Sequence, residues 1–418
     1  MKILVIGSGA REDVICKTLL KNADNVVFCA PGNDGMKLSG IKTISIDEDD
    51  FDRMANFAKT NNIDFTVVGP EEPLVNGIVD FFKKNKLKIF GPNKEAAKVE
   101  GSKSFTKKIM ADAGVPTAKY EEFTDLDAAL EYLKLDQTFP IVIKADGLAA
   151  GKGVYISEDL GDATKVVSEL LDGHKFNTHK VVIEEFLEGE EFSLMAFVDH
   201  KRFYPMPLAQ DYKKIFDGDM GLNTGGMGAV CPVQNISSDI EQEAITTVLK
   251  PFIDELHHQG IKYTGILYAG LILTKNGIKV IEFNARFGDP ETEVVLPRLE
   301  SDLSMIFNSI LKHKKISSIQ WNDDGLNLGV FAVSNGYPKK PIFGSLGKIE
   351  DFKNCPLTIN YSGVRKTDGQ LVSNGGRLYL LQTSASTLKE AQDIIYANFA
   401  KMDTRNIFYR KDIGKNSI

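Results

Sequence analysis

The chain has 418 residues, of which 43% are hydrophobic and 26% charged, a balance typical of a globular protein with two or three domains. The net charge of −7 argues against a non-specific nucleic-acid binder, and no apolar run approaches the roughly 18 residues of a membrane span. Four cysteines without a CxxC pair or a Cys/His cluster predict reduced thiols, no zinc site, no disulfide framework and a cytoplasmic location.

The N-terminal residues predict a parallel strand followed by a phosphate-binding turn. Lys2–Ile6 is an apolar run, Gly7–Gly9 is a turn, and a helical pattern continues to Leu20. Backbone N–H groups at the start of such a helix can hold a phosphate. A nicotinamide dinucleotide would require glycine where this chain has Glu12, so a dinucleotide site is disfavoured.

Two further strands end in turns of similar composition. Val26–Cys29 leads into Ala30–Gly35, and Phe65–Val68 leads into Gly69–Leu74. The carboxyl ends of parallel strands lie at one edge of an open α/β sheet, so we expect the three turns to form one ligand crevice. The alternative is that they are ordinary strand-to-helix turns.

Lysines mark the next region. A helix is expected over Lys94–Ala113, and its Lys103 and Lys107 face either solvent or a ligand. The strand Phe139–Ala145 carries Lys144 among apolar residues. An unpaired buried ammonium is costly, so Lys144 implies an anionic partner.

The loop Asp146–Val154 follows directly and is rich in glycine. It supplies a second lysine, Lys152. The P-loop signature fails because three residues rather than four separate Gly147 from Gly151, and because Gly153 replaces the hydroxyl residue. We therefore expect a phosphate-covering loop of another kind, with a plain flexible hairpin as the alternative.

Acidic and glycine-rich loops come next. The strands Lys180–Phe186 and Phe192–Val198 flank an acidic turn whose side chains either bind ribose hydroxyls or are solvated. The segment Gln210–Gly228 is predicted to be a long structureless loop, and such a loop inside a compact domain is usually functional.

A strand over Lys279–Phe283 carries the most informative residues. Glu282 and Asn284 lie on one face of it. A carboxylate and an amide oxygen on a rigid strand suit Mg²⁺, and Arg286, next on that face, can hold a phosphate or carboxylate. The alternative is an amphipathic edge strand with a solvated face.

Beyond about residue 308 the chain is predicted to be β-rich. Strands are expected at Leu328–Ser334, Leu357–Ser362 and Leu378–Thr383, and a final helix at Leu388–Phe399.

Taken together, these stretches resemble the ATP-grasp superfamily, and most closely the phosphoribosylamine–glycine ligase family of purine biosynthesis. The resemblance covers the whole chain, and the glycine-rich and Arg286-containing motifs together are its most specific part. The stretches that carry it are Val67–Leu74, Gly101–Phe105, Ile143–Val154, Asn223–Gly228, Glu282–Thr292 and Arg410–Gly414.

The resemblance implies an α/β and α+β multidomain fold in three regions. Residues 1–100 would form an N-terminal open parallel α/β sheet, the pre-ATP-grasp substrate-binding domain. Residues 101–307 would form a two-lobed ATP-grasp domain with an ATP lid lobe at about 115–190, and residues 308–418 a small β-rich C-terminal domain. The implied reaction is ATP-dependent ligation of glycine to 5-phosphoribosylamine through glycyl phosphate. Mg²⁺ or Mn²⁺ would be the cofactor, the partners small molecules only, and the protein a monomer or weak homodimer.

The resemblance also assigns roles to individual residues. ATP would be held by Lys103, Lys144, Gly151, Lys152, Gly153, Glu184, Glu185, Phe186, Leu187 and Glu190. Glycine and phosphoribosylamine would be held by Gly9, Arg11, Asn33, Gly35, Gly69, Pro70, Glu71, Asp211, Thr224, Gly225, Gly226, Met227, Gly228, Arg286 and Asp289. Glu282 and Asn284 would bind the metal, and Lys144, Lys152, Arg286 and Asp211 would be catalytic.

The chain departs from the family pattern in two places. The first turn usually reads Gly-Gly-Arg-Glu-His, whereas Ala10 and Asp13 replace a glycine and the histidine here. Ala10 disfavours a positive φ, and Asp13 is expected to add negative charge near a phosphate site. The strand Thr264–Leu273 also lacks the acidic metal ligand of many ATP-grasp enzymes.

Three other functions stay open at this point. Another ATP-dependent purine ligase or carboxylase would lack the combined glycine-rich and Arg286-containing motifs. A nicotinamide-dependent dehydrogenase is opposed by Glu12. A catalytically silent nucleotide-binding protein is opposed by the intact lysines and metal-binding pair, although Asp13 keeps this function open.

Overall fold

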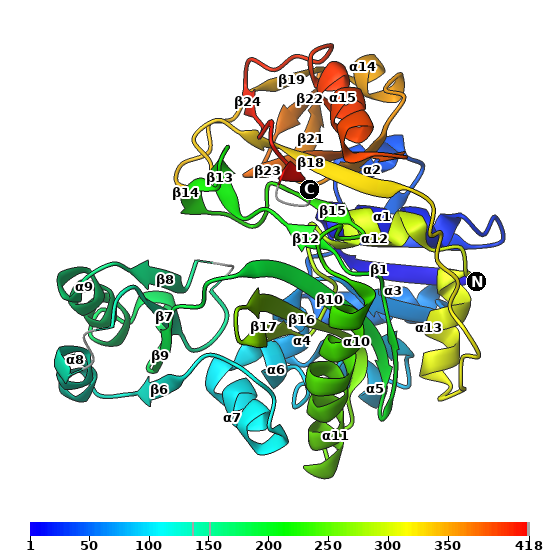
Figure 1. Ribbon diagram of the computed structural model, residues 1–418. Coiled ribbons are helices and arrows are strands. Elements are labelled where there is room, and N and C mark those ends of the chain that lie inside the picture. Colours follow the sequence, from blue (N-terminus) through cyan, green and yellow to red (C-terminus); the bar gives the residue numbers. More distant parts are fainter. Residues whose placement is uncertain (136–137, 150–151, 416–418) are drawn as a thin grey trace.

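The computed structural model describes residues 1–135, 138–149 and 152–415 (Figure 1). The N-terminal region is an all-parallel sheet with the strand order β3-β2-β1-β4-β5. Its strands are β1 (Lys2–Gly7), β2 (Val26–Pro31), β3 (Lys42–Thr43), β4 (Phe65–Val68) and β5 (Ile89–Phe90). Its helices are α1 (Ala10–Leu20), α2 (Asp34–Leu38), α3 (Phe51–Thr60), α4 (Glu71–Asn76) and α5 (Ile78–Lys84).

The central strand β1 explains this arrangement. Residues 3–6 are all 0% exposed, because helices cover both faces of a parallel sheet. β1 pairs with β2 on one side and with β4 on the other. The turns after these three strands therefore lie at one edge of the sheet, as the sequence predicted.

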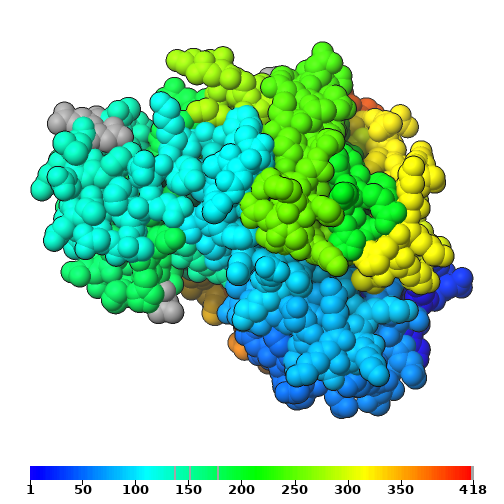
Figure 2. All heavy atoms as spheres, turned by 90° about the horizontal axis from the view of Figure 1, so that it is seen from below, coloured from blue at the N-terminus to red at the C-terminus, as the bar shows by residue number. Residues whose placement is uncertain are grey.

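A small antiparallel sheet with the order β6-β9-β7-β8 forms a separate lobe. Its elements are β6 (Tyr120–Phe123), β7 (Ile141–Ala145), β8 (Val154–Ser157), β9 (Val181–Glu185), α8 (Leu126–Leu135) and α9 (Leu160–Leu171). Ile143, Val167 and Leu170 are fully buried within a core that belongs to this lobe alone. Figure 2 shows the lobe projecting to one side of the N-terminal residues, which are blue.

A second antiparallel sheet, with the order β11-β10-β16-β17, lies between this lobe and the rest of the molecule (Figure 1). Its strands are β10 (Glu190–Asp199), β11 (Arg202–Pro205), β16 (Thr264–Thr274) and β17 (Gly277–Asn284). The helices of this part of the chain are α6 (Lys98–Gly101), α7 (Lys103–Ala113), α10 (Ser238–Ala244), α11 (Lys250–His258), α12 (Thr292–Val295) and α13 (Leu303–Leu311).

The N-terminal sheet and this second sheet share one core. Phe307 on α13 packs against Phe90 of β5 and Phe197 of β10, with ring centroids 4.5 Å and 6.0 Å apart. Aromatic pairs at these separations bury large areas and add directional contacts. The two sheets are therefore held in a fixed relative position.

The C-terminal region is built on a sheet with the order β12-β15-β18-β23-β20, to which β24 adds beside β18. Its strands are β12 (Gln210–Asp211), β15 (Gly228–Cys231), β18 (Leu326–Ser334), β20 (Thr358–Tyr361), β23 (Arg377–Ala385) and β24 (Ile407–Phe408). A smaller sheet comprises β19 (Ser345–Lys348), β22 (Gln370–Ser373) and β21 (Val364–Thr367). The helices of this region are α14 (Ile349–Lys353) and α15 (Leu388–Phe399).

Two expectations were wrong. The helix over Lys94–Ala113 is broken at Ser102, whose extended backbone ends α6 and whose Oγ accepts a hydrogen bond from the Phe105 N–H to begin α7. The segment Gln210–Gly228 is not structureless. It contains β12 and a hairpin of β13 (Lys214–Phe216) and β14 (Met220–Asn223).

The segment Gln210–Gly228 and the strand that follows it belong in part to the C-terminal sheet. Because β12 and β15 pair into the C-terminal sheet, a strand pair from the middle of the chain completes the sheet of the last region. No helix in the described part of the chain is long and apolar enough to cross a membrane.

Arg410 anchors the hairpin to the C-terminal sheet. Its side chain is 1% exposed and pairs with Asp412 and Asp219 at 2.8 Å, and it donates to the Lys214 carbonyl at 3.0 Å. We expect Arg410→Met to lower the free energy of unfolding by about 3 kcal/mol, because two carboxylates lose their buried partner. Chemical denaturation of the two proteins measures the difference.

The matched control is Arg405→Met. Arg405 pairs with Asp403, but its side chain is 83% exposed, and exposed ion pairs contribute little. Equal destabilisation by the two substitutions would contradict an anchoring role for Arg410.

Candidate active site

Two adjoining cavities lie between the separate lobe and β17. They share Lys144, Glu184, Ile281, Glu282, Asn284 and Arg286 as lining residues. The first also contacts Glu71, Lys103 and Gly153, and the second Glu185, Phe186, Leu187, Asp211, Thr224, Gly225 and Asp289. The structure thus brings together most of the side chains that the resemblance assigns to ATP, metal and substrates.

A buried carboxylate stands between two lysines on the first cavity wall. Glu184 Oε2 lies 3.0 Å from Lys144 Nζ and 3.1 Å from Lys107 Nζ, and Lys144 also donates to the Ile281 carbonyl. Burial lowers the pKa of Lys107 to about 8, against the opposing charge of Glu184. The anionic partner that Lys144 required is therefore Glu184, and Lys107 faces the protein interior rather than solvent.

Glu282 and Asn284 meet the requirements of a divalent metal. Asn284 Nδ2 donates to Glu282 Oε1 at 3.1 Å, which fixes the amide so that its oxygen is available as a ligand. Burial opposes ionisation of Glu282, but Lys213, Lys144 and the Asn284 hydrogen bond together lower its pKa. An ionised carboxylate and an amide oxygen are ligands that Mg²⁺ and similar cations prefer. Gly270 stands opposite Glu282 on β16, as the lack of an acid there predicted.

A second charged group lines the opposite wall. Lys213 Nζ lies 2.7 Å from Glu191 Oε2 and 3.8 Å from Asp211 Oδ1. Burial and the carboxylates of Glu291, Glu191 and Glu282 raise the pKa of Asp211 to about 7, against the charge of Lys213. Asp211 is therefore able to take up or release a proton near neutral pH.

Arg286 connects these cavities to the N-terminal sheet. Its Nη2 lies 3.0 Å from Glu100 Oε1 and its Nε 3.4 Å from Glu71 Oε2. Glu71 begins α4 at the carboxyl end of β4. Burial opposes ionisation of Glu71, but the charges of Arg286 and Arg11 lower the pKa of this carboxyl group. The guanidinium is thus positioned at the junction of the crevice and the metal-binding pair.

The crevice itself is shaped by Glu12. Its Oε2 accepts from the Gly9 N–H at 2.7 Å and its Oε1 from Arg11 Nε at 2.6 Å. A Cβ at Gly69 would lie 2.0 Å from Glu12 Oε1, so only glycine fits there. Glu12 therefore stands at the position where a dinucleotide-binding turn carries its third glycine, which allows close helix–strand packing.

The C-terminal region packs against the N-terminal turns. Asn33 Nδ2 donates to the Ser8 carbonyl at 2.8 Å and to the Tyr361 carbonyl at 3.1 Å. A Cβ at Gly35 would lie 2.3 Å from the Tyr361 ring. Asn33 and Gly35 thus take part in a contact between regions that are far apart in sequence.

The expectations for Ala10 and Asp13 need correction. Ala10 is the first residue of α1 and is not among the described residues with positive φ, so it imposes no unusual turn. Asp13 is 0% exposed, pairs with Lys17 at 2.8 Å and accepts from the Tyr361 N–H at 2.6 Å. Burial raises its pKa. Asp13 therefore joins α1 to β20 instead of adding free charge to the crevice.

Other predicted residues lie outside the two cavities. Gly9, Arg11, Asn33, Gly35, Gly69 and Pro70 lie in and beside the turns at the carboxyl edge of the N-terminal sheet, where the crevice stays a prediction, while Lys152, Glu190, Gly226, Met227 and Gly228 lie elsewhere. Lys152 is exposed, and Met227 packs in the C-terminal core. Gly151 lies outside the described residues.

Sequence reasoning missed several residues of the site. Lys213, Glu100 and Arg377 were not predicted, and Lys107 was left undecided. Glu100 directly precedes the Gly101–Phe105 motif and Lys213 follows Asp211 by two positions, so motif proximity could have suggested both. Arg377, on β23, donates to Asp289 Oδ2 at 2.6 Å and to the Gly225 carbonyl. No local sequence pattern indicates that Arg377 reaches these residues.

Comparison with known families agrees with this geometry. Models of the N, ATP-grasp (A) and C domains of phosphoribosylglycinamide synthetase match residues 1–100, 101–292 and 327–416. A phosphoribosylamine–glycine ligase of Lactococcus lactis is 48% identical over 420 residues, which cover 100% of both chains. The chain belongs to the phosphoribosylamine–glycine ligase family.

Further members and solved structures support the assignment. A phosphoribosylamine–glycine ligase of Listeria innocua is 46% identical, with 99% of each chain covered. The crystal structure of a Thermotoga maritima phosphoribosylamine–glycine ligase has a TM-score of 0.85 at 30% identity and covers 99% of this chain and 100% of that one. A biotin carboxylase of Campylobacter jejuni, at 16% identity, a TM-score of 0.73 and coverage of 98% and 93%, shares the fold.

The junction at Arg286 predicts a pH-dependent stability. Burial raises the pKa of Glu100 to about 7, against the charge of Arg286. The Glu100 carboxyl group then binds a proton more tightly in the native state than in the unfolded chain. The free energy of unfolding therefore falls as the pH rises from about 4.5 to about 7. We expect Glu100→Gln to weaken this fall by up to about 3 kcal/mol. Urea denaturation of both proteins at pH values from 5 to 8 measures it.

The control is Glu95→Gln, since Glu95 is exposed on the preceding segment. A pH profile for Glu100→Gln that parallels those of wild type and control would contradict the assigned protonation.

Proposed function

We propose that this protein joins glycine to 5-phosphoribosylamine with conversion of ATP to ADP and phosphate, a step of purine biosynthesis. One observation carries the proposal in the structure: Arg286 connects the cavity of lysines and metal-binding oxygens with the N-terminal crevice. Full-length relatives named phosphoribosylamine–glycine ligase support it independently.

ATP would occupy the cavity beside the separate lobe. The β9 strand and the residues after it, Glu184 to Leu187, would meet adenine largely through the backbone, and Glu190 would bind the ribose. Lys103, which donates to the Gly147 carbonyl at 3.0 Å, and Lys144 would neutralise the phosphates. The loop with Gly151, Lys152 and Gly153 would cover them.

Glu282 and Asn284 would hold the divalent metal, which we propose to be Mg²⁺ or Mn²⁺. The ion would neutralise charge on the phosphates of ATP. A biotin carboxylase domain of Hydrogenobacter thermophilus, which shares the fold at 14% identity with a TM-score of 0.74 over 98% of this chain and 91% of that one, was solved in complex with MgADP.

The reaction is proposed to follow two steps. A glycine carboxylate oxygen attacks the γ-phosphorus of ATP, which forms glycyl phosphate as the bond to ADP breaks. The amine of phosphoribosylamine then attacks the acyl carbon, the C–N bond forms, and phosphate leaves. Asp211 is suited to receive the amine proton, because its pKa is about 7.

Positioning and charge supply the rest of the catalysis. Lys144, Lys152 and Arg286 would stabilise the charge on the transferred phosphoryl group. Lys213, held between Asp211 and Glu191, adds a positive charge on the opposite wall. Acyl phosphates hydrolyse readily, so the glycine-rich loop would exclude water during the reaction.

The two substrates would bind at the junction. Phosphoribosylamine would lie in the crevice formed by Gly9, Arg11, Asn33, Gly35, Gly69, Pro70 and Glu71. Glycine would lie near Arg286, Asp289, Asp211 and the loop Thr224–Gly228. The three sequence regions, 1–100, 101–307 and 308–418, would correspond to substrate binding, ATP binding and closure of the crevice.

The function is tested by product formation. We expect ADP and phosphate release to require ATP, a divalent metal, glycine and phosphoribosylamine together, with glycinamide ribonucleotide as the product. Each component is withheld in turn, and the product is identified by mass spectrometry. Release with another carboxylate and amine, but none with this pair, would overturn the assignment.

The metal-binding pair is tested by Glu282→Gln. We expect turnover to fall at least a hundredfold while the melting temperature stays within a few degrees, because the amide keeps the shape but loses the charge. Steady-state rates over a range of Mg²⁺ concentrations measure this. Glu243→Gln, exposed on α10, is the control, and wild-type turnover in Glu282→Gln would remove Glu282 from the mechanism.

A further inference from the structure

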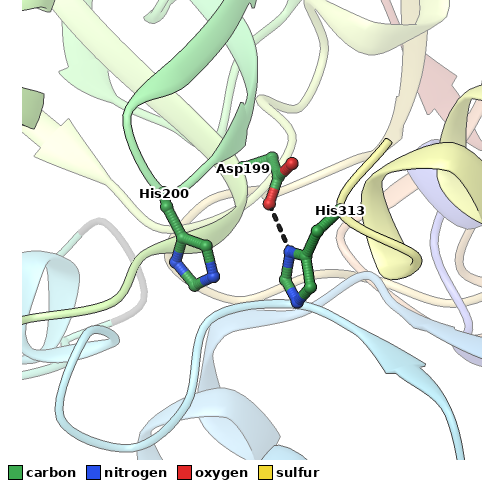
Figure 3. Close-up of side chains that lie close together, drawn as sticks. All are labelled: Asp199, His200 and His313. Atoms are coloured by element: carbon green, nitrogen blue, oxygen red, sulfur yellow. Dashed lines mark hydrogen bonds and ion pairs between the residues drawn. The ribbon is translucent and has the colours of Figure 1, made fainter. Parts of the chain in front are cut away.

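Two histidines and an aspartate lie together at a distance from the candidate active site (Figure 3). Asp199 is the last residue of β10, His200 begins the turn to β11, and His313 follows α13. Ser193, which contacts the carboxylate of Glu291 at the cavity, is six residues or about 20 Å away along β10. The group therefore has no part in the ligase site.

The three side chains present convergent metal ligands. One possible ligand atom from each lies within 4.8 Å of the other two, and no other such group of three occurs among the described residues. His313 Nδ1 lies 2.6 Å from Asp199 Oδ1. The imidazole rings of His200 and His313 stack with centroids 4.7 Å apart, and His200 Nδ1 is buried without a hydrogen-bond partner in the described structure.

We propose that Asp199, His200 and His313 bind a transition-metal ion such as Zn²⁺. Zinc takes imidazole nitrogens and carboxylate oxygens at about 2.0–2.2 Å in tetrahedral geometry, so its ligand atoms stand about 3.3 Å apart. The present ligand atoms lie within 4.8 Å of one another, so metal binding requires the side chains to move closer together. His313 is 54% exposed, whereas Asp199 is 1% exposed, so the His313 side chain has more room to move than the carboxylate. The bound ion takes the place of the hydrogen bond between His313 and Asp199, and the imidazole proton moves to the ring nitrogen that does not bind the metal.

The basic residues around this group favour a transition-metal ion over a hard cation such as Mg²⁺. Arg202 pairs with the other oxygen of Asp199 at 2.5 Å, and the positive charges of Lys83 and Lys262 act on His200. A hard cation such as Mg²⁺ needs several oxygen ligands and negative charge, which this group lacks. Zn²⁺, Ni²⁺ and Cu²⁺ gain affinity from imidazole nitrogen and tolerate the basic neighbourhood better. Two imidazoles and one carboxylate leave a fourth position for water.

A bound ion would join two segments that are distant in sequence. The β10–β11 turn and the segment after α13 are connected at present by the His313–Asp199 contact and by Arg202, which donates to the His313 carbonyl at 2.6 Å. α13 carries Phe307, the centre of the core between the two sheets. An ion that binds only the folded chain therefore stabilises this junction.

The test is a calorimetric titration of Zn²⁺ into the full chain in excess Mg²⁺, which occupies oxygen-only sites. We expect one zinc ion per chain and a higher melting temperature with zinc. His200→Ala and His313→Ala are each expected to weaken binding at least tenfold, because each removes one of three ligands. His313→Ala alters an exposed side chain, so its fold is expected to survive.

Two controls separate this site from others. His174→Ala/His179→Ala removes a second histidine pair, with ring centroids 4.8 Å apart, which belongs to no described group of three ligands. Glu282→Gln removes the proposed Mg²⁺ ligand. Both variants are expected to bind zinc as wild type does. The proposal fails if wild type binds no zinc in excess Mg²⁺, if His200→Ala and His313→Ala bind unchanged, or if a control loses binding equally.

Discussion

The pairing of Arg286 with Glu100 and Glu71 is the constraint on which the candidate active site depends. A buried guanidinium loses its hydration, and the loss amounts to several kcal/mol unless close carboxylates offset it. Arg286 follows β17, Glu71 begins a helix of the N-terminal sheet, and Glu100 lies on the short helix α6 between them. The three charges are compatible with burial only when the N-terminal sheet docks against β17. That docking in turn fixes the crevice beside the metal-binding oxygens.

The buried lysines of the first cavity are likewise paired with a carboxylate. Glu184 alone faces both Lys107 and Lys144, so one negative charge balances two positive ones. Four basic side chains line this cavity beside four carboxylates, Glu71, Glu100, Glu184 and Glu282. A divalent cation held by Glu282 and Asn284 would therefore supply the additional positive charge that a polyanion such as a nucleotide triphosphate needs. Because the lysines are already fixed by Glu184 and by the Ile281 carbonyl, little rearrangement is needed when an anion binds. Fixed charges in a water-poor cavity are the main source of rate enhancement in phosphoryl transfer.

Sequence patterns predicted those parts of the molecule that depend on local structure. The apolar run of β1 with its glycine turn, the lone charge of Lys144 on β7, and the alternation that places Glu282 beside Asn284 are set by strand periodicity and burial. The break at Ser102 was missed because a helical pattern on both sides concealed a capping residue. The family resemblance, rather than periodicity, was the basis on which residues of the N-terminal turns were assigned to substrates, and that assignment stays a prediction.

Contacts between distant parts of the chain could not be predicted in this way. Asp13 appears in sequence as a free charge beside a phosphate turn, yet Lys17 and the Tyr361 N–H engage it from the other side. Nothing near residues 210–228 indicates that β12 and β15 join strands more than ninety positions later. Such pairings are decided by tertiary packing, which overrides local propensity.

The same contacts give the C-terminal region a part in the site. Arg377 of β23 holds both Asp289 and the Gly225 carbonyl, and packs over the Phe331 ring at 4.6 Å. Asp289 Oδ1 is buried without a described partner, so one oxygen is fixed by Arg377 while the other stays available. A carboxylate held in this way can orient an amine without a change in its own position. The C-terminal sheet therefore contributes to the candidate site, because β12 and β15 hold the loop Thr224–Gly228 on the same sheet that positions Arg377.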